Sequence, residues 1–234
     1  MLGGSWARGD ARAASDIDLW AYGLARAVPE RTVDGFLVVV DASGERAERV
    51  RLRRPPFFGA AVPGWRAARI LYDPDGIARR LRTEARRFRW ERVARACDRW
   101  VARELVGWAE DVVKLVRALA DGHAATASVQ RNLIANRMAP IVAAHRRIFW
   151  DSENGLWERV AAAVGGPWAR AQRGALGVPN VRHAASCRAA LLLYAETARE
   201  VAATLSPTQR AVVDFALRTA GLGRPAPPVR RRSR

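Results

Sequence analysis

Cysteines and long apolar runs are scarce in this 234-residue chain, and each scarcity excludes a class of protein. The two cysteines, Cys97 and Cys187, are too few and too isolated for a disulfide framework or a zinc site, which indicates a reducing compartment. No stretch approaches the ~20 uninterrupted apolar residues of a membrane span, and the opening residues lack the apolar core of a signal peptide. We therefore expect a soluble, cytoplasmic protein with no membrane partner.

Lysine is nearly absent as well. Lys114 is the only one, so the formal charge of +17 comes almost entirely from arginine. A basic excess of this size can indicate nucleic acid, because clustered cations release counterions when they meet phosphates. Here the arginines accompany abundant alanine, as expected for a GC-rich genome, and basic faces of this kind are usually solvated helix surface. We therefore do not expect nucleic acid to be the main partner.

Two compositions follow one another along the chain. Short β-branched runs at 17–22 and 36–40 predict strands, and the alternating run at 49–53 predicts a third strand, paired with the second as a hairpin across a turn at 41–44. From about residue 77 helical periodicity dominates. The predicted helices cover 78–95, 98–120, 126–149, 153–164, 182–204 and 207–220.

This pattern predicts an α+β chain in three parts. Residues 1–76 form a small sheet domain with flanking helices, and residues 77–220 form an α-helical bundle. Half of all residues are apolar, which is enough for a sizeable core. Residues 221–234 are rich in glycine, proline and arginine, which predicts a disordered basic tail.

The segment from 4 to 19 carries the residues best suited to chemistry. Gly4-Ser5 predicts a tight turn whose backbone N–H groups and hydroxyl can approach a phosphate closely. Asp16 and Asp18 stand two apart on a predicted strand, so both carboxylates point to one face, where they repel unless a cation lies between them. Oxygen ligands of this kind suit Mg²⁺. The plainer alternative is that Asp16 caps a turn and Asp18 is solvated.

Gly-Ser, ten intervening residues and then Asp-x-Asp at the start of an apolar strand closely resemble the nucleotidyltransferase signature of the polymerase-β superfamily. The resemblance implies a mixed sheet with flanking helices, in which the Gly4-Ser5 turn contacts ATP or another nucleoside triphosphate. It also implies that Asp16 and Asp18 are catalytic and hold Mg²⁺. Arg8 is a candidate for steering phosphates, with an internal salt bridge to Asp10 as the alternative.

A second candidate pair lies in the predicted helical half. Glu110 and Lys114 are one helical turn apart on a polar stripe made by positions 103, 107, 110, 114 and 117. A surface ion pair explains this spacing, but a single lysine among so many arginines suggests a place that a guanidinium does not fit. The segment resembles the C-terminal domain of kanamycin-type aminoglycoside nucleotidyltransferases, in which a general-base glutamate precedes a phosphate-binding lysine by four residues.

On this resemblance Glu110 is the catalytic base that removes a proton from the acceptor hydroxyl, and Lys114 binds the triphosphate. The acceptor is then a small hydroxylated antibiotic, such as an aminoglycoside or a lincosamide, and the enzyme confers resistance to it. The site lies between two subunits in that family, which implies a homodimer.

The sequence departs from the family where a third carboxylate is usual, on the second strand of the hairpin. Arg49 or Arg51 holds that place, and an arginine there could take the position of the second metal ion. Asp41 or Glu48 substitutes only if the register differs. The family also carries a helix and a full strand before Gly-Ser, so the true start of the chain is expected to lie upstream.

Two alternatives to an active transferase remain open. The first is a catalytically impaired homologue that binds nucleotide, suggested by the arginines at the third-acid strand. The second is a toxin–antitoxin-type nucleotidyltransferase module, because Arg117 and His123 have the spacing found in the helical ribonuclease partners of minimal nucleotidyltransferases. Because His123 follows Gly122 at a predicted helix end, a solvated cap explains this histidine better.

Overall fold

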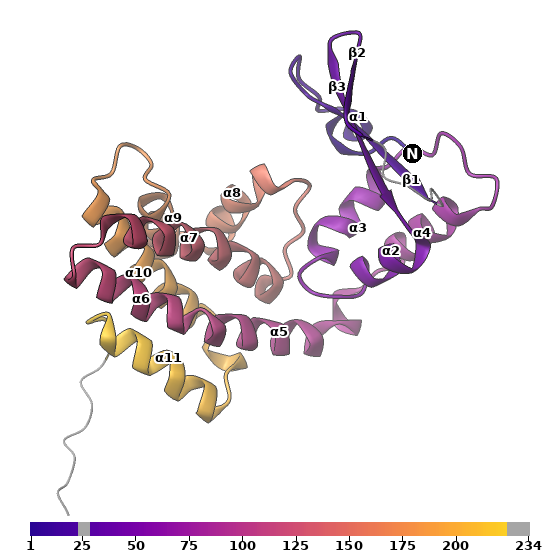
Figure 1. Cartoon of the computed structure of the whole chain (residues 1–234). Coiled ribbons are helices and arrows are strands. Elements are labelled where there is room, and N and C mark those ends of the chain that lie inside the picture. The colour runs from indigo at the N-terminus through magenta and orange to yellow at the C-terminus, as the bar shows by residue number, and fades with distance from the viewer. Residues whose placement is uncertain (23–28, 224–234) are drawn as a thin grey trace, which may run out of the picture. The chain divides into compact units, whose positions relative to one another are not determined.

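The computed structural model describes residues 1–22 and 29–223 of the chain (Figure 1). A small mixed sheet near the N-terminus is followed by helices, so the α+β class is confirmed. The chain divides into two compact units. The first contains Met1–Trp100 and Ala143–Arg159, and the second contains Val101–Val142 and the residues from Val160 onward. Most of the predicted basic tail, 224–234, lies outside the described residues.

The sheet of the first unit has three strands in the order β1-β3-β2. Strand β1 (Ile17–Tyr22) pairs in parallel with β3 (Phe36–Ser43), which pairs in antiparallel fashion with the short β2 (Arg31–Val33). On the other side of β1, Leu2 forms isolated bridges to Leu19 and to Arg69. The strands predicted at 17–22 and 36–40 are therefore present.

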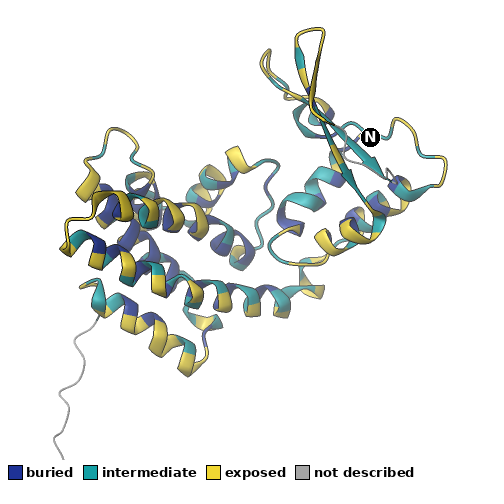
Figure 2. Cartoon of the chain, viewed as in Figure 1, coloured by how far each residue is buried: buried dark blue, intermediate teal, exposed yellow. Residues whose placement is uncertain are grey.

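Short helices accompany this sheet. They are α1 (Gly4–Arg8), α2 (Glu45–Arg51), α3 (Phe58–Ala67), α4 (Ile77–Arg86) and the 3₁₀ helix η1 (Trp90–Arg92). Their apolar side chains form the core of the unit, with Phe58, Trp65 and Leu81 at most 1% exposed. Figure 2 shows this buried side on α3 and α4. Trp20 and Tyr22 of β1 pack on Trp65, so the core joins the sheet to α3.

The third predicted strand, at 49–53, is wrong. Strand β3 continues through the expected turn to Ser43, and helix α2 follows Gly44. Glu45 stands in the first turn of α2 and accepts a hydrogen bond from Arg49 at 2.8 Å, and both the helix dipole and the i,i+4 pair favour this arrangement. The alternation of arginine with apolar residues is thus part of a helix whose Leu52 end is buried.

The remaining helices of the described residues, seven α-helices and one 3₁₀ helix, outnumber the five predicted from residue 98 onward, although most lie close to the predicted positions. They are α5 (Ala94–Gly107), α6 (Ala109–Ala120), α7 (Ala124–Arg146), α8 (Glu153–Val164), α9 (Gly166–Ala175), α10 (His183–Glu200), η2 (Ala202–Thr204) and α11 (Pro207–Thr219). The helix predicted at 98–120 is divided at Trp108, and α9 was not predicted. Ser206 caps α11 and forms a capping box with Gln209, as expected for a helix start before Pro207.

Trp168 and Tyr194 belong to the core of the second unit. The indole N–H of Trp168 donates to Thr197 Oγ1 at 2.9 Å, and the Tyr194 hydroxyl donates to the carbonyl of Leu105 at 3.0 Å. Leu192, on the same helix as Tyr194, is 37% exposed. In the described part of the chain, no helix has the length and apolar character needed to span a membrane.

Candidate functional site

The Gly-Ser turn and the Asp-x-Asp strand meet at Gly4. The backbone N–H of Gly3 donates to the carbonyl of Asp18 at 2.8 Å, which holds the start of α1 against β1. Gly4 has a φ of +56°, and a Cβ placed on it would lie 1.7 Å from Asp18 Oδ2. Only glycine fits both this backbone conformation and this contact. The carboxylate of Asp18 therefore lies directly against the first residue of α1.

Asp16 and Asp18 differ in their surroundings. Asp16 is exposed, whereas Asp18 is partly buried beside the turn. Burial raises the pKa of Asp18 above its ordinary value, and the negative charges of Asp16 and Asp41 raise this pKa further, while Arg8 opposes them. The carboxylates thus repel each other, and a bound cation would relieve that repulsion.

Arg8 forms the internal salt bridge that was the alternative to phosphate steering. Its guanidinium lies 3.2 Å from Asp10 and donates to the backbone carbonyl of Asp151 at 3.3 Å. The same guanidinium acts electrostatically on Asp18. Arg8 is therefore held in place by the end of α1 and the segment after α7, and a phosphate would have to compete with Asp10 for it.

The donors near the turn suit a hard divalent cation, because they are the carboxylates of Asp16 and Asp18 and the hydroxyl of Ser5. Among residues 1–22 and 29–223, no group of three or more His, Cys, Asp or Glu side chains is arranged to hold a metal ion. Mg²⁺ commonly takes one or two carboxylates and completes its shell with water and substrate phosphates. The carboxylates of Asp16 and Asp18 match that preference in kind and number.

The arginines expected on a third-acid strand lie on helix α2 instead. Arg49 pairs with Glu45, and Arg51 lies 3.3 Å from Glu48 and 4.0 Å from Asp41. The expectation of an arginine on the sheet beside the two aspartates is therefore wrong, because the residues that follow β3 form a helix and not a paired strand.

The two acids considered as substitutes have different fates. Glu48 is 4% exposed and accepts hydrogen bonds from Trp65 Nε1 at 3.0 Å and Ser43 Oγ at 2.9 Å, so this carboxylate is structural. Asp41 is exposed on β3 and pairs in register with Trp20, two residues beyond Asp18 on β1. Parallel partners share a face, so Asp41 lies on the face that carries Asp18. The sequence pattern did not predict the parallel pairing of β1 with β3, which brings the charge of Asp41 close enough to raise the pKa of Asp18.

Glu110 and Lys114 belong to the second unit, on helix α6. The Nζ of Lys114 lies 2.8 Å from Glu110 Oε1, and both side chains are well exposed. The hydrogen bond from Lys114 and its charge hold the pKa of Glu110 below its ordinary value and raise the pKa of Lys114. The stripe at 103, 107, 110, 114 and 117 is exposed as predicted. A general base acts best with a pKa near the working pH, and the ion pair moves the pKa of Glu110 away from that range. In this structure Glu110 and Lys114 therefore form a surface ion pair.

The residues behind the toxin–antitoxin alternative lie near the end of the same helix. Arg117 is in the last turn of α6, and His123 is exposed just after Gly122, with its backbone N–H donating to the carbonyl of Ala118. His123 is thus the solvated residue at a helix end that its position predicted.

Neither the search of protein-family models nor that of curated proteins finds a match to this chain. The function of the site is therefore inferred from its own residues and from the motif they form.

Proposed function

We propose that this protein is a nucleotidyltransferase, which moves a nucleoside monophosphate from an Mg²⁺-bound nucleoside triphosphate to a hydroxyl group of a small acceptor. The observation that carries the proposal is the contact of Asp18 Oδ2 with Gly4, which joins the two halves of the sequence motif at one point. If the turn and the strand were not in contact, Asp18 would place no requirement for glycine on position 4.

Different residues of the first unit would bind the phosphates and the metal ion of the nucleoside triphosphate. The Gly4-Ser5 turn offers backbone N–H groups and a hydroxyl to phosphate oxygens. Asp16 and Asp18 would hold Mg²⁺, and Asp41 on the same face of the sheet would add negative charge near it. Bound Mg²⁺ neutralises triphosphate charge in an in-line displacement. The raised pKa of Asp18 means that protons compete for the carboxylate, so nucleotide binding should strengthen as the pH rises.

An antibiotic of the aminoglycoside or lincosamide type is the acceptor that we propose. Glu110 as the base, Lys114 as a triphosphate ligand and a homodimer remain predictions of the family resemblance. The ion pair that lowers the pKa of Glu110 would have to open before this residue could remove a proton. Glu110→Gln in the transfer assay tests the role of the base. Sedimentation of the purified protein tests the homodimer.

Transfer of label tests the proposal directly. The protein is incubated with labelled nucleoside triphosphates, Mg²⁺ and a panel of aminoglycosides and lincosamides, and the modified acceptor is measured. We expect Asp16→Asn to abolish transfer and the matched change Asp75→Asn, at an exposed acid of the same unit, to leave it unchanged. Equal transfer by wild type and Asp16→Asn would refute the metal site.

The impaired homologue is separated from the enzyme by a binding measurement. If nucleotide with Mg²⁺ raises the melting temperature but no acceptor in the panel is labelled, the chain binds nucleotide without efficient transfer. If neither effect is seen and Asp18→Asn behaves like wild type in both assays, the proposed function is wrong.

A further inference from the structure

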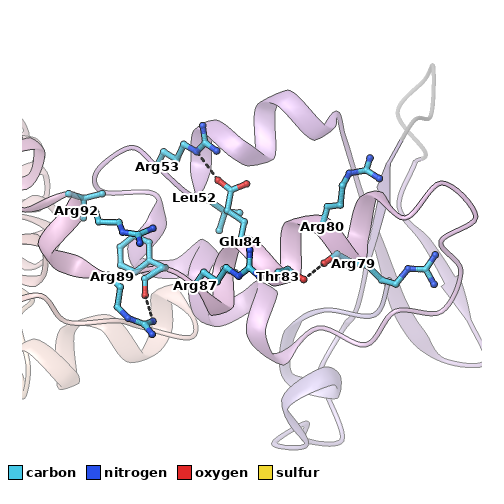
Figure 3. Close-up of a pocket in the computed structure, with 12 residues that line it drawn as sticks. Leu52, Arg53, Arg79, Arg80, Thr83, Glu84, Arg87, Arg89 and Arg92 are labelled. Atoms are coloured by element: carbon cyan, nitrogen blue, oxygen red, sulfur yellow. Dashed lines mark hydrogen bonds and ion pairs between the residues drawn. The ribbon is translucent and has the colours of Figure 1, made fainter.

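The first unit contains a groove of about 700 Å³ that lies apart from the Gly4-Ser5 turn and the two aspartates, none of which lines it. It is formed by Leu52 and Arg53 after α2, by one side of α4 and by the segment that leads into α5 (Figure 3). Six arginines line it, namely Arg53, Arg79, Arg80, Arg87, Arg89 and Arg92. Glu84 is the single acidic residue among its lining residues.

Three of these arginines are neutralised by carboxylates. The shortest nitrogen-to-oxygen distances are 2.7 Å for Arg53 to Glu84, 3.4 Å for Arg79 to Asp73 and 3.1 Å for Arg80 to Glu45. Their positive charge is therefore largely balanced within the protein, and they contribute shape more than net charge.

The other three are not balanced. Within the described residues, Arg87, Arg89 and Arg92 have no carboxylate partner, and all three are exposed. Arg89 donates only to backbone carbonyls, among them that of Phe88 at 3.0 Å. Figure 3 shows these three side chains toward one end of the groove, whereas Arg79 and Arg80 lie toward the other. Like charges grouped in this way repel each other unless an anion lies among them.

The base of the groove is apolar. Leu52 is 2% exposed, Ala85 is fully buried, and Phe88 and Val93 are half-buried beside them. Apolar surroundings exclude water and strengthen the attraction between a guanidinium and an anion. Guanidinium forks also match phosphate oxygens in a bidentate geometry, which makes arginine the favoured residue for phosphate recognition.

We propose that this groove is a second binding site, which takes a compact ligand carrying two or more phosphate groups on Arg87, Arg89 and Arg92. Its volume lies within the ~300–1,000 Å³ usual for small-molecule sites. The proposal does not depend on the nucleotidyltransferase function, because it uses none of the same residues.

Binding of inorganic tripolyphosphate, measured by calorimetry in EDTA, tests the groove alone, since EDTA removes metal-dependent binding at Asp16 and Asp18. We expect the double variant Arg87→Gln/Arg92→Gln to bind at least about tenfold more weakly than wild type. The matched control is Arg46→Gln/Arg99→Gln, which removes the same charge from exposed positions outside the groove of the same unit, and it should stay within about twofold. All four positions are exposed, so we expect both double variants to melt like wild type. Unchanged melting curves would show that the fold is retained.

Three results would overturn the proposal. They are absence of saturable binding to the wild type, equal weakening by the control pair, and unchanged binding by the groove variant. A final arm separates a compact ligand from a nucleic-acid backbone, using a single-stranded RNA as competitor. If tripolyphosphate displaces the RNA from the wild type, the groove binds compact phosphates. If RNA binds and tripolyphosphate fails to displace it, the ligand class proposed here is wrong.

Discussion

Replacing Gly4 by alanine tests how tightly the turn and Asp18 are joined. Alanine in the left-handed conformation that Gly4 adopts costs about 1–2 kcal/mol. Its methyl group would also lie 1.7 Å from Asp18 Oδ2, so the Asp18 side chain must leave its rotamer, at about 0.5–1.5 kcal/mol more. We expect Gly4→Ala to lower the free energy of unfolding by about 1.5–3.5 kcal/mol in all, as measured by urea denaturation.

The chain provides a matched control in Gly9, which ends α1. Gly9 has a φ of +84°, but a Cβ placed there meets nothing within 4 Å. Gly9→Ala therefore carries the backbone cost alone, about 1–2 kcal/mol. The difference between the two variants isolates the contact with Asp18. If Gly4→Ala and Gly9→Ala lower the unfolding free energy equally and bind Mg²⁺-nucleotide equally, Asp18 does not lie where the structure places it.

Three further changes probe groups whose partners are known. Glu48→Ala should lower the free energy of unfolding by about 2–3 kcal/mol, because it leaves the indole N–H of Trp65 buried without an acceptor, and a denaturation curve like that of wild type would contradict this. Thr197→Val should cost about 1–3 kcal/mol in the same assay, because Trp168 loses its acceptor, and a neutral result would show that the indole finds another. Asp18→Asn should stabilise the protein at pH 7: a carboxyl with a raised pKa in the folded state binds more protons than in the unfolded state, so its stabilising contribution falls as the pH rises through that pKa. This gain should vanish below its ordinary pKa of 3.8, and denaturation series at several pH values with no such trend would count against the burial of Asp18.

The parts of the fold that could be predicted are those whose signal is local. The apolar run at 17–22 forms β1, and Ser206-Pro207 starts α11, because strand alternation and capping depend on neighbouring residues. Helix α9 escapes prediction because Gly165 precedes it, Gly166 begins it and Gly174 lies near its end, and glycine weakens the helical signal. Its Trp168 is 1% exposed, and the burial of a large aromatic side chain is a property that residue type alone favours.

The segment at 49–53 shows where a local signal misleads. Arginine and apolar residues alternate there with the period of a strand, but Val50 is 40% exposed and Leu52 is 2% exposed, so only one of the two apolar side chains contacts the core. Helix α2 is favoured by tertiary interactions that the pattern does not contain, namely Trp65 on Glu48 and Glu84 near Arg49. The predicted hairpin put arginines beside the two aspartates, whereas the parallel pairing of β1 and β3 puts Asp41 on the face that carries Asp18.

The arginines of the chain explain why composition could not locate the groove. A count of charges treats every arginine as solvated surface, whereas the effect of each depends on whether a carboxylate faces it. On α4, Arg80 is neutralised by Glu45, which lies far earlier in the sequence, while Arg87, just after the same helix, has no carboxylate partner in the described part of the chain. Part of the charge that carboxylates leave unbalanced therefore lines an apolar-floored groove. A genome bias toward arginine explains their number, but it does not explain why three unpaired guanidiniums share one concavity, and an anionic ligand does.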